Sequence, residues 1–488
     1  MIFPAHILVL SFQSVLTWVL LVGYFMLIVT LIVAVLSENR NPLKALGWVT
    51  ALLLFPIGGV VLYLVFGRSM RNVKMISRRN RRRLLNSGQR PAMPRFGKMV
   101  STDNCQRIQL GYNIAEAPVY QDNVVEIFNE GAPMFERMLT DIRNAGSYIY
   151  FQFYIIANDS LGRKVSDALI ERAKAGVRIK VIYDYVGSFG SLSQNLFARL
   201  RANGIEVHSF FRIQFPEQLG RLNWRNHRKA VIIDGHTGYI GGMNVASRYV
   251  DGGRQGHWRD LAIRITGPAV LALQHNFAID WKFMGHALLT DEPTGTPLPS
   301  SDDSLPGIMA QIIASGPTNR WGNTHMLFLK AISGARRRVY LQTPYFLPSE
   351  GLLSALQCAA LSGVDVRIMM PRRSDSSILT NASASFIEES LLAGIKVYMY
   401  EPGMLHSKML LVDDDFVTLG STNFDYRSFE HNFEENIVLY SREANQAIAA
   451  LFKEDQKNST LVRLSEWNQR PTLCKARESL SRLFSPIL

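Results

Sequence analysis

Cysteine and charged residues are both scarce in this sequence of 488 residues. Its three cysteines, Cys105, Cys358 and Cys474, lie far apart, which excludes a disulfide framework and a cysteine-rich metal module and suits a reducing compartment. Charged residues make up 19% of the chain and hydrophobic residues 47%, so a mainly disordered chain is excluded as well. The length exceeds that of one ordinary domain, and we expect several.

Acidic residues are almost absent from the first 100 positions, which hold 13 lysines and arginines but only one acid, Glu38. This segment therefore carries nearly all of the formal net charge of +13, and residues 101–488 are close to neutral. A nucleic-acid-binding body is disfavoured, because such a body would carry the basic residues itself. The basic residues gather between positions 68 and 83, where they would attract anionic lipid head groups.

Charge of either sign is missing from residues 15–36 and from residues 45–66. Each run is long enough to cross a bilayer as a helix, since about 20 apolar residues suffice, and the short connection predicts a transmembrane hairpin. Two buried core helices and a cleaved signal peptide are alternatives, but the length without charge and the lack of a cleavage site disfavour them. The basic residues that follow predict a multi-pass protein with its N-terminus and body on the cytoplasmic side.

The remaining sequence contains an internal duplication. A buried-strand signal at residues 148–156 and a glycine turn followed by a strand at 175–184 recur at 339–347 and 362–371, each time with a helical segment between them. This alternation predicts an α/β fold of two similar halves with parallel sheets. The predicted organisation is a transmembrane hairpin at 1–67, a basic juxtamembrane segment and linker at 68–118, a first half at 119–290, a linker at 291–307 and a second half at 308–488.

Both halves carry the same polar residues at the same spacing. The first set is His227, Lys229, Asp234 and Asn244, and the second is His406, Lys408, Asp413, Ser421 and Asn423, with Gly242 in the first half where Ser421 stands in the second. Along a strand, the histidine and the lysine two residues later share one face. Two copies at equal spacing favour a shared site over a pair of exposed polar strands.

Together, the two sets suit the chemistry of a phosphodiester. The lysines and asparagines offer hydrogen-bond donors to the non-bridging oxygens. One histidine can attack phosphorus while the other protonates the departing alkoxide, a role that suits a side chain with a pKa near neutrality. No carboxylates or cysteines accompany them at metal-ligand spacing, so we expect neither a metal nor a cofactor.

The doubled motif resembles the phospholipase D superfamily over residues 120–460. The membrane hairpin and residues 343–350, 403–408 and 423–434 resemble the bacterial cardiolipin synthases more specifically. The resemblance implies two phospholipase D-like halves packed face to face and a covalent phosphohistidine intermediate formed without a metal. It also implies that an acidic residue after each motif orients a histidine. Asp260 and Glu434 match these positions, with Glu435 as a competing choice, and Asp234 and Asp413 belong to the catalytic motif although their part in it can be structural.

The function that the resemblance implies is the transfer of a phosphatidyl group from one phosphatidylglycerol to another at the bacterial plasma membrane, giving cardiolipin and glycerol. We assign His227 as the nucleophile and His406 as general acid and base, an order that the near-symmetry of the motifs leaves open. Asn244, Asn423 and Ser421 are predicted to bind the substrate. A phospholipase D that hydrolyses lipid, a nuclease and an inactive membrane scaffold are the alternatives. The expected partners are phosphatidylglycerol and other anionic lipids, not nucleic acid, and no oligomeric state is predicted.

One difference between the halves is an insertion of 11 residues before His227. It contains aromatic residues mixed with arginines: Phe210, Phe211, Phe215 and Trp224 with Arg212, Arg221 and Arg225. Two interpretations are open. The segment lies at the membrane interface, where such mixtures are favoured, or it is a solvated loop with some packed aromatic side chains.

Overall fold

A computed structural model of the protein describes residues 5–38, 42–67, 69–71, 73–86, 100–192, 195–212, 223–290 and 298–485. Its internal contacts divide the chain into two units. One unit comprises Met1–Asn72 with Ile213–Asn223, and the other comprises Val73–Arg212 with Trp224–Leu488. Each unit is described by itself.

The N-terminal unit is helical. It contains α1 (Ala5–Glu38), α2 (Pro42–Leu54), α3 (Pro56–Leu62) and a π-helical turn, η1 (Tyr63–Gly67). Within α1, Gln13–Ser37 has a mean hydropathy of 3.0 and only 11% of its most apolar window is buried, so it is long and apolar enough to cross a membrane. Val35, Leu52 and Tyr63 form the small core that packs these helices together.

The predicted second membrane helix at 45–66 is not continuous. The helix breaks at Phe55 (φ −125°, ψ 75°), because Pro56 starts the next helix and cannot donate the hydrogen bond that would continue the first. The result is two shorter apolar helices, and α1 is the one helix of the described residues that meets the length for a full span. The predicted second span is therefore interrupted at Phe55, and the transmembrane hairpin, its multi-pass topology and the cytoplasmic side of the body stay predictions.

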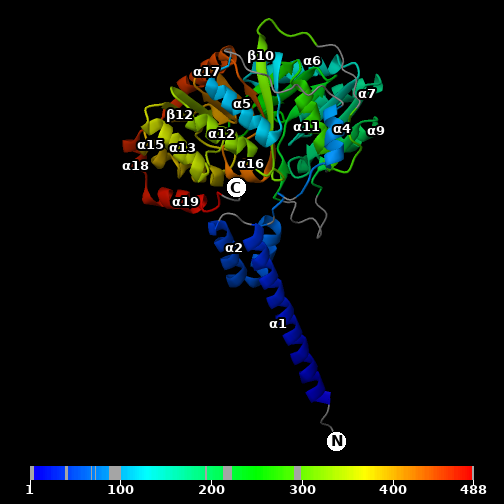
Figure 1. Ribbon diagram of the computed structural model, residues 1–488, viewed down its shortest axis with the longest axis vertical. Helices are drawn as coiled ribbons and strands as arrows, with labels where there is room; N and C mark the ends of the chain where they lie inside the picture. Colours follow the sequence, from blue (N-terminus) through cyan, green and yellow to red (C-terminus); the bar gives the residue numbers. More distant parts are fainter. Residues whose placement is uncertain are drawn as a thin grey trace. The chain divides into compact units, whose positions relative to one another are not determined.

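The second unit is built on one continuous mixed sheet that runs through both halves (Figure 1). In the first half the strands are β1 (Val119–Phe128), β2 (Tyr148–Phe153), β3 (Arg178–Asp184), β4 (Glu206–Phe210), β5 (Arg225–Asn226), β6 (Ala230–Ile233), β7 (Thr237–Gly241), β8 (His257–Arg259) and β9 (Ala262–Thr266). In the second half they are β10 (Leu305–Ser315), β11 (Arg338–Gln342), β12 (Asp365–Pro371), β13 (Lys396–Tyr400), β14 (Gly403–Leu405), β15 (Met409–Val412), β16 (Phe416–Gly420), β17 (Asn432–Leu439) and β18 (Ser459–Leu461).

The helices cover the sheet to either side of β10, as Figure 1 shows. Before and within the first half they are α4 (Arg78–Asn86), α5 (Thr102–Ala115), α6 (Gly131–Arg143), α7 (Ser160–Lys174), α8 (Phe189–Leu192), α9 (Leu196–Ala202), α10 (Arg248–Asp251) and α11 (Val270–Phe283). In the second half they are α12 (Asn323–Ser333), α13 (Glu350–Leu361), α14 (Ser377–Ala384), α15 (Ile387–Leu392), α16 (Tyr426–Glu430), α17 (Arg442–Lys457), α18 (Leu464–Asn468) and α19 (Thr472–Arg482).

The duplication predicted from the sequence is confirmed in the order of the elements. β2, α7 and β3 form a parallel strand–helix–strand unit, and β11, α13 and β12 repeat it. The sheet is mixed rather than parallel throughout, because β6 and β7 form a hairpin and β6 runs antiparallel to β2. The halves share this sheet through the antiparallel pair β1 and β10. The boundaries proposed for the halves stay predictions, and residues 291–297 of the proposed linker lie outside the described residues.

The aromatic insertion is packed into the body where the structure describes it. Phe210 and Phe211 are 0% and 7% exposed and contact the rings of Phe283 and Phe433. Arg225 is buried as well and pairs with Asp184 at 3.4 Å. The membrane-interface interpretation is therefore wrong for these side chains. Phe215 and Arg221 lie outside the described residues.

Candidate active site

His227 reaches the site at the end of β5, a strand of the first half that pairs with β17 of the second half. The two strands are parallel, and their register sets the residue before His227 opposite Phe433. The backbone N–H of His227 donates to the carbonyl of Phe433 at 2.8 Å, which continues the pairing by one residue. His227 therefore lies beside the next residue of β17, Glu434.

His406 reaches the site in the reciprocal way. It follows β14 of the second half, which pairs in parallel with β8 of the first half, and its N–H donates to the carbonyl of Arg259 at 2.7 Å. The residue after Arg259 is Asp260, which lies beside His406. Each histidine thus receives its acidic neighbour from the opposite half, so both halves are needed to complete either pair.

The ring of His227 is held in one tautomer by its neighbours. Its Nδ1 lies 3.0 Å from both carboxylate oxygens of Glu434 and 3.0 Å from the carbonyl oxygen of Ser421. Since these are acceptors, Nδ1 carries the proton and the lone pair is on Nε2. No hydrogen bond of that Nε2 is found within the described part of the chain, and the ring is 8% exposed.

The ring of His406 has a different set of neighbours. Its Nδ1 lies 2.6 Å from Asp260 Oδ2, 3.2 Å from the Tyr249 hydroxyl and 2.8 Å from Lys408 Nζ. The Asp260 carboxylate accepts from a protonated Nδ1, whereas the Lys408 amino group donates to an unprotonated one, and the Tyr249 hydroxyl can do either. The neighbours of His406 therefore do not select one protonation state of its ring. The two histidines have the same backbone setting but different polar surroundings.

The ionisation of the two pairs differs accordingly. Burial lowers the pKa of His227 to about 4, against the opposing charge of Glu434. Burial alone would raise the pKa of Glu434, but His227 and Lys229 outweigh it, so this pKa is lowered. Burial raises the pKa of Asp260 to about 6 although Lys408 opposes it, while burial and Lys408 lower the pKa of His406. The pair of His406 and Asp260 therefore takes up a proton closer to neutrality than the pair of His227 and Glu434.

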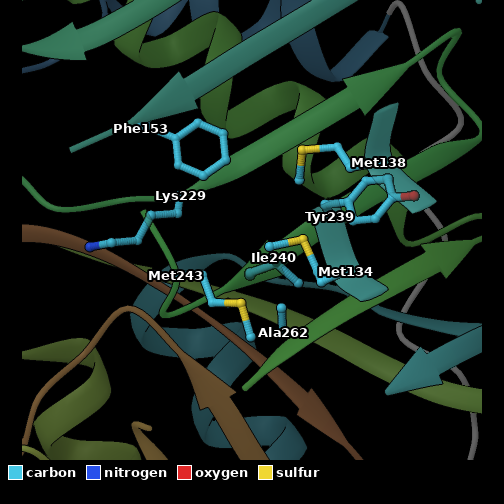
Figure 2. Close-up of a pocket in the computed structure, with 9 residues that line it drawn as sticks. Met134, Met138, Phe153, Lys229, Tyr239, Ile240, Met243 and Ala262 are labelled. Carbon is cyan, nitrogen blue, oxygen red and sulfur yellow. The ribbon is translucent and has the colours of Figure 1, made fainter. Parts of the chain in front are cut away.

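Both lysines are buried beside the histidines. Lys229 and Lys408 donate to the backbone carbonyls of His227 and His406, the first at 2.5 Å. Burial lowers the pKa of Lys408 to about 8 and that of Lys229 well below its usual range. Figure 2 shows the amino group of Lys229 pointing away from an apolar cavity of about 10 Å³. The side chains lining that cavity beside the lysine include Met134, Met138 and Met243.

The two asparagines are not equivalent. Asn244 accepts from the Ile155 N–H at 3.2 Å and donates to the Tyr249 hydroxyl at 3.1 Å, so its amide is used within the protein. Asn423 Oδ1, by contrast, is buried and has no hydrogen-bond partner among the described residues. Oδ1 is an acceptor and cannot bind a phosphate oxygen, but no hydrogen bond of Asn423 Nδ2 is found among the described residues either, so this donor is the group left for a substrate phosphate.

Ser421 lies behind the site rather than open to it. It is fully buried, and its hydroxyl donates to Glu434 Oε2 at 2.5 Å. At the matching position, a Cβ on Gly242 would stand 2.3 Å from Asp260 Oδ1. The serine therefore supports the longer acid, and the glycine leaves room for the shorter one.

Glu435 does not compete for the histidine. It points to the other face of β17, where its Oε1 accepts from Asn276 Nδ2 at 2.5 Å. Burial raises its pKa to about 7. Of the two neighbouring acids, Glu434 is the one in contact with His227.

Asp234 and Asp413 do not join the histidine cluster, which corrects their place in the predicted catalytic group. Each follows a strand that leads away from the lysine, at a turn with φ of +51°. Their carboxylates accept backbone N–H groups at the start of the neighbouring strand: Gly146, Ser147 and Tyr148 for Asp234, and Arg336, Arg337 and Arg338 for Asp413. These contacts fix the backbone where β2 and β11 begin, which is a structural role.

Two tyrosines at the site escaped the sequence analysis. Tyr154 packs its ring against His227, with 5.0 Å between ring centroids, and Tyr249 contacts His406. Tyr154 was hidden in a run that reads as a buried strand. Tyr249 stands five residues after Asn244, where the second half has Ser428 after Asn423, and this unequal pair was the available signal. Among the described residues, no three His, Cys, Asp or Glu side chains are grouped as metal ligands would be.

Known protein families match the N-terminal region and both halves of the body. The family described as cardiolipin synthase, phospholipase D-like domain, matches residues 138–281 and 328–456, one segment in each half. A family described as the phospholipase D-nuclease N-terminal region matches residues 25–68.

Curated relatives match over nearly the whole length. The major cardiolipin synthase ClsA of Bacillus subtilis is 38% identical, covering 96% of this chain and 99% of its own. Cardiolipin synthase 1 of Staphylococcus aureus is 35% identical, covering 97% of both chains. Among solved structures, phosphatidylserine synthase of Haemophilus influenzae superimposes with a TM-score of 0.59 at 14% identity, covering 79% of this chain and 100% of its own, a likeness of fold.

Proposed function

Since the chain belongs to the cardiolipin synthase family of phospholipase D-like phosphatidyltransferases, we propose that it joins two phosphatidylglycerol molecules into cardiolipin and releases glycerol. The observation that carries the proposal is the crossed pairing of each histidine with an acid of the other half. The charge interaction between His227 and His406 supports a single site, and their unequal proton affinity suits a two-step transfer.

In the first step, Nε2 of His227 attacks the phosphorus of one phosphatidylglycerol. The bond from phosphorus to the glycerol oxygen breaks, and His406 gives its proton to that oxygen. Glu434 supports the proposal for His227, because an ionised carboxylate at Nδ1 stabilises the positive charge that the ring gains when it binds phosphorus. The products of this step are free glycerol and a phosphatidyl group bound to His227.

In the second step, a hydroxyl of the second phosphatidylglycerol attacks the phosphorus. His406 removes the hydroxyl proton, and the bond between phosphorus and His227 breaks to give cardiolipin. The pair of His406 and Asp260 suits this exchange, since its proton affinity is nearer to neutrality. An anionic phosphodiester in the site raises that affinity further.

Lys229, Lys408 and Asn423 are proposed to hold the non-bridging oxygens. The lysines are buried beside the histidines, and Asn423 is buried two residues after Ser421, whose carbonyl contacts His227, so hydrogen bonds to a charged phosphate form where water competes little. Asn244 is proposed to act through Tyr249, to which it donates. Ser421 is proposed to act through Glu434.

For the N-terminal unit, we propose that α1 spans the bacterial plasma membrane and that α2 and α3 cross it as one bent segment. A proline-induced break is tolerated in a membrane segment that packs on a neighbouring helix. The arginines and lysine after Gly67 support a cytoplasmic position of the body, by the positive-inside rule. Single cysteines before α1 and after η1, labelled from each side of sealed vesicles with an impermeant reagent, test this topology. Labelling of the two positions from opposite sides would contradict it.

The reaction is tested with the purified full-length protein in phosphatidylglycerol liposomes without added metal. Cardiolipin and glycerol in equal amounts support transfer, whereas phosphatidic acid and glycerol identify a phospholipase that uses water. The order of the histidines is tested with phosphatidyl-p-nitrophenol, whose leaving group needs no proton. His406→Gln is expected to release one equivalent of nitrophenol and accumulate a label on His227, and His227→Gln is expected to release none. A label on His406 in the His227→Gln variant would reverse the assignment.

A further inference from the structure

The C-terminal helix α19, drawn in red in Figure 1, lies on the outside of the second half. Its less exposed side is polar. Glu478 is 8% exposed and accepts from Arg470 Nη2 at 3.0 Å. Arg482 pairs with Glu389 of α15, and its guanidinium lies 4.2 Å from the centre of the Phe386 ring. The first pair ties α19 to the turn before it, and the contacts of Arg482 join it to α15 and the Phe386 ring.

The outer side of the same helix is apolar. Leu473 and Leu480 are seven residues apart, which places them on one face, and they are 74% and 60% exposed. Leu483 and Phe484 continue this face just beyond the helix and are 74% and 47% exposed. A helix on a water-soluble domain has the opposite arrangement, with the apolar face against the core. The reversal indicates that something other than water covers this side.

The charges of α19 fit an anionic surface. Its one acid, Glu478, is paired inside, Arg482 pairs with Glu389, and Lys475 donates to the Asn468 carbonyl at 3.0 Å, which leaves Arg477 on the outer side. Arg477 is exposed and follows the helix face next to the leucines. A helix with leucine and phenylalanine on one side and an exposed arginine beside them fits the head-group layer of an anionic bilayer.

The position of α19 also connects it to the site. The helix packs along α14, whose first turn exposes Ile378 by 51%. The loop before α14 contains Asp375, which accepts from the Tyr345 hydroxyl at 2.6 Å and lies close enough to His406 to act on its charge. Through α14 and this loop, α19 is connected to the half of the site that holds His406, and the bearing of this connection on lipid transfer rests on the proposed function.

We propose that Leu473, Leu480, Leu483 and Phe484 insert into the head-group layer of an anionic bilayer and hold the second half against it. Tethering by α1 alone would keep the body near a membrane without fixing which face meets the lipid. The exposed face of α19 supplies that orientation. The proposed partner of this apolar face is the lipid surface. The alternative is a second copy of the chain, and the test distinguishes the two.

The test uses the full chain in liposomes. Cys105→Ser, Cys358→Ser and Cys474→Ser remove the native thiols, and Leu480→Cys then carries a bimane label in phosphatidylglycerol vesicles with and without doxyl-labelled lipid. The matched control is Leu361→Cys on α13, where the side chain is 72% exposed. We expect the lipid quencher to reduce the fluorescence at position 480 at least threefold more than at 361. Equal quenching at both positions overturns the proposal. Disulfide cross-linking between two Leu480→Cys chains without lipid quenching overturns it in favour of a contact between copies.

A second measurement distinguishes an effect on membrane binding from an effect on the catalytic reaction. Leu473→Ser with Leu480→Ser is expected to lower turnover in phosphatidylglycerol liposomes about tenfold and to leave turnover of a short-chain phosphatidylglycerol, dissolved as monomers, unchanged. The melting temperature is expected to stay the same, because neither side chain is buried. Equal losses on both substrates would contradict a role at the membrane. If neither substrate reacts even with the unaltered chain, the proposed function fails, while the quenching result still decides the surface.

Discussion

The crossed pairs predict that Asp260→Asn and Glu434→Gln damage different steps, each belonging to the histidine of the other half. Both contacts are charged, short and buried, at 2.6 Å for His406 and 3.0 Å for His227. A hydrogen bond of this kind is worth about 1.5–3 kcal/mol. At about 1.4 kcal/mol for each factor of ten, its loss slows the dependent step roughly 10- to 150-fold.

The assay follows nitrophenol release from phosphatidyl-p-nitrophenol in a stopped-flow instrument, alongside steady-state synthesis of cardiolipin. Glu434→Gln is expected to slow the burst by the factor above, because the burst reports the attack by His227. Asp260→Asn is expected to keep the burst and to slow cardiolipin synthesis, which needs His406 to move a proton. Glu435→Gln, on the opposite face of the same strand and with a pKa already raised to about 7, is the control with near-normal rates.

The opposite result refutes this reasoning. If Asp260→Asn abolishes the burst and Glu434→Gln spares it, then either each acid serves the histidine of its own half or the roles of the two histidines are reversed. An equal loss of the burst in both variants would show that neither acid acts on one histidine alone.

Further predictions concern the groups around these pairs. Gly242→Ser is expected to push the Asp260 carboxylate away, since even a Cβ would stand 2.3 Å from it, and to lower synthesis about tenfold or more with the melting temperature little changed; normal synthesis would show that Asp260 can shift freely. Synthesis is expected to fall as the pH rises through about 8, where Lys408 loses its proton, and Lys408→Arg is expected to be slower but to lack this alkaline decline, as a pH–rate profile checks. Asp234→Ala is expected to lower the free energy of unfolding by about 3 kcal/mol through three lost backbone contacts, while the folded fraction keeps its activity; loss of activity without loss of stability would return it to the catalytic group. Phe210→Ala is expected to cost about 3–5 kcal/mol of stability, measured by urea unfolding, and to leave liposome binding unchanged.

Much of the fold could be read from local patterns. The strand signals at residues 148–156 and 339–347 and the glycine turns that precede β3 and β12 have the right order, although β2 ends at Phe153 and β11 at Gln342, before the predicted runs end. Local patterns succeed here because apolar runs between turns are decided by neighbouring residues. They fail at Phe55, where a single proline outweighs an apolar run that is otherwise long enough for one helix.

The site could be predicted in its residue types but not in its pairing. Spacing along each strand identifies His227 with Lys229 and His406 with Lys408, since these residues are local neighbours. Nothing local shows that Glu434 faces His227, because that contact depends on β5 pairing with a strand about 200 positions later in the chain. The same holds for the short strands that bring Asp260 to His406.

For the two turn aspartates and the aromatic insertion, local sequence patterns predicted a role that the structure does not support. Asp234 and Asp413 share the regular spacing of the motif, and spacing does not distinguish a group that reacts from one that holds a turn at positive φ. Phe210 and Phe211 lie in a segment whose composition suits a membrane surface. Their burial depends on Phe283 and Phe433, which come from distant parts of the sequence.

The exchange of acids across the two halves has a consequence for the history of the chain. A protein made of one half alone would hold a histidine whose carboxylate is carried by a different copy of itself. Two identical copies related by a two-fold axis would lend each other these acids and build two equal pairs. After fusion of the two copies into one gene, each histidine–acid pair could change independently. Gly242 with Asp260 could then arise beside one histidine, and Ser421 with Glu434 beside the other.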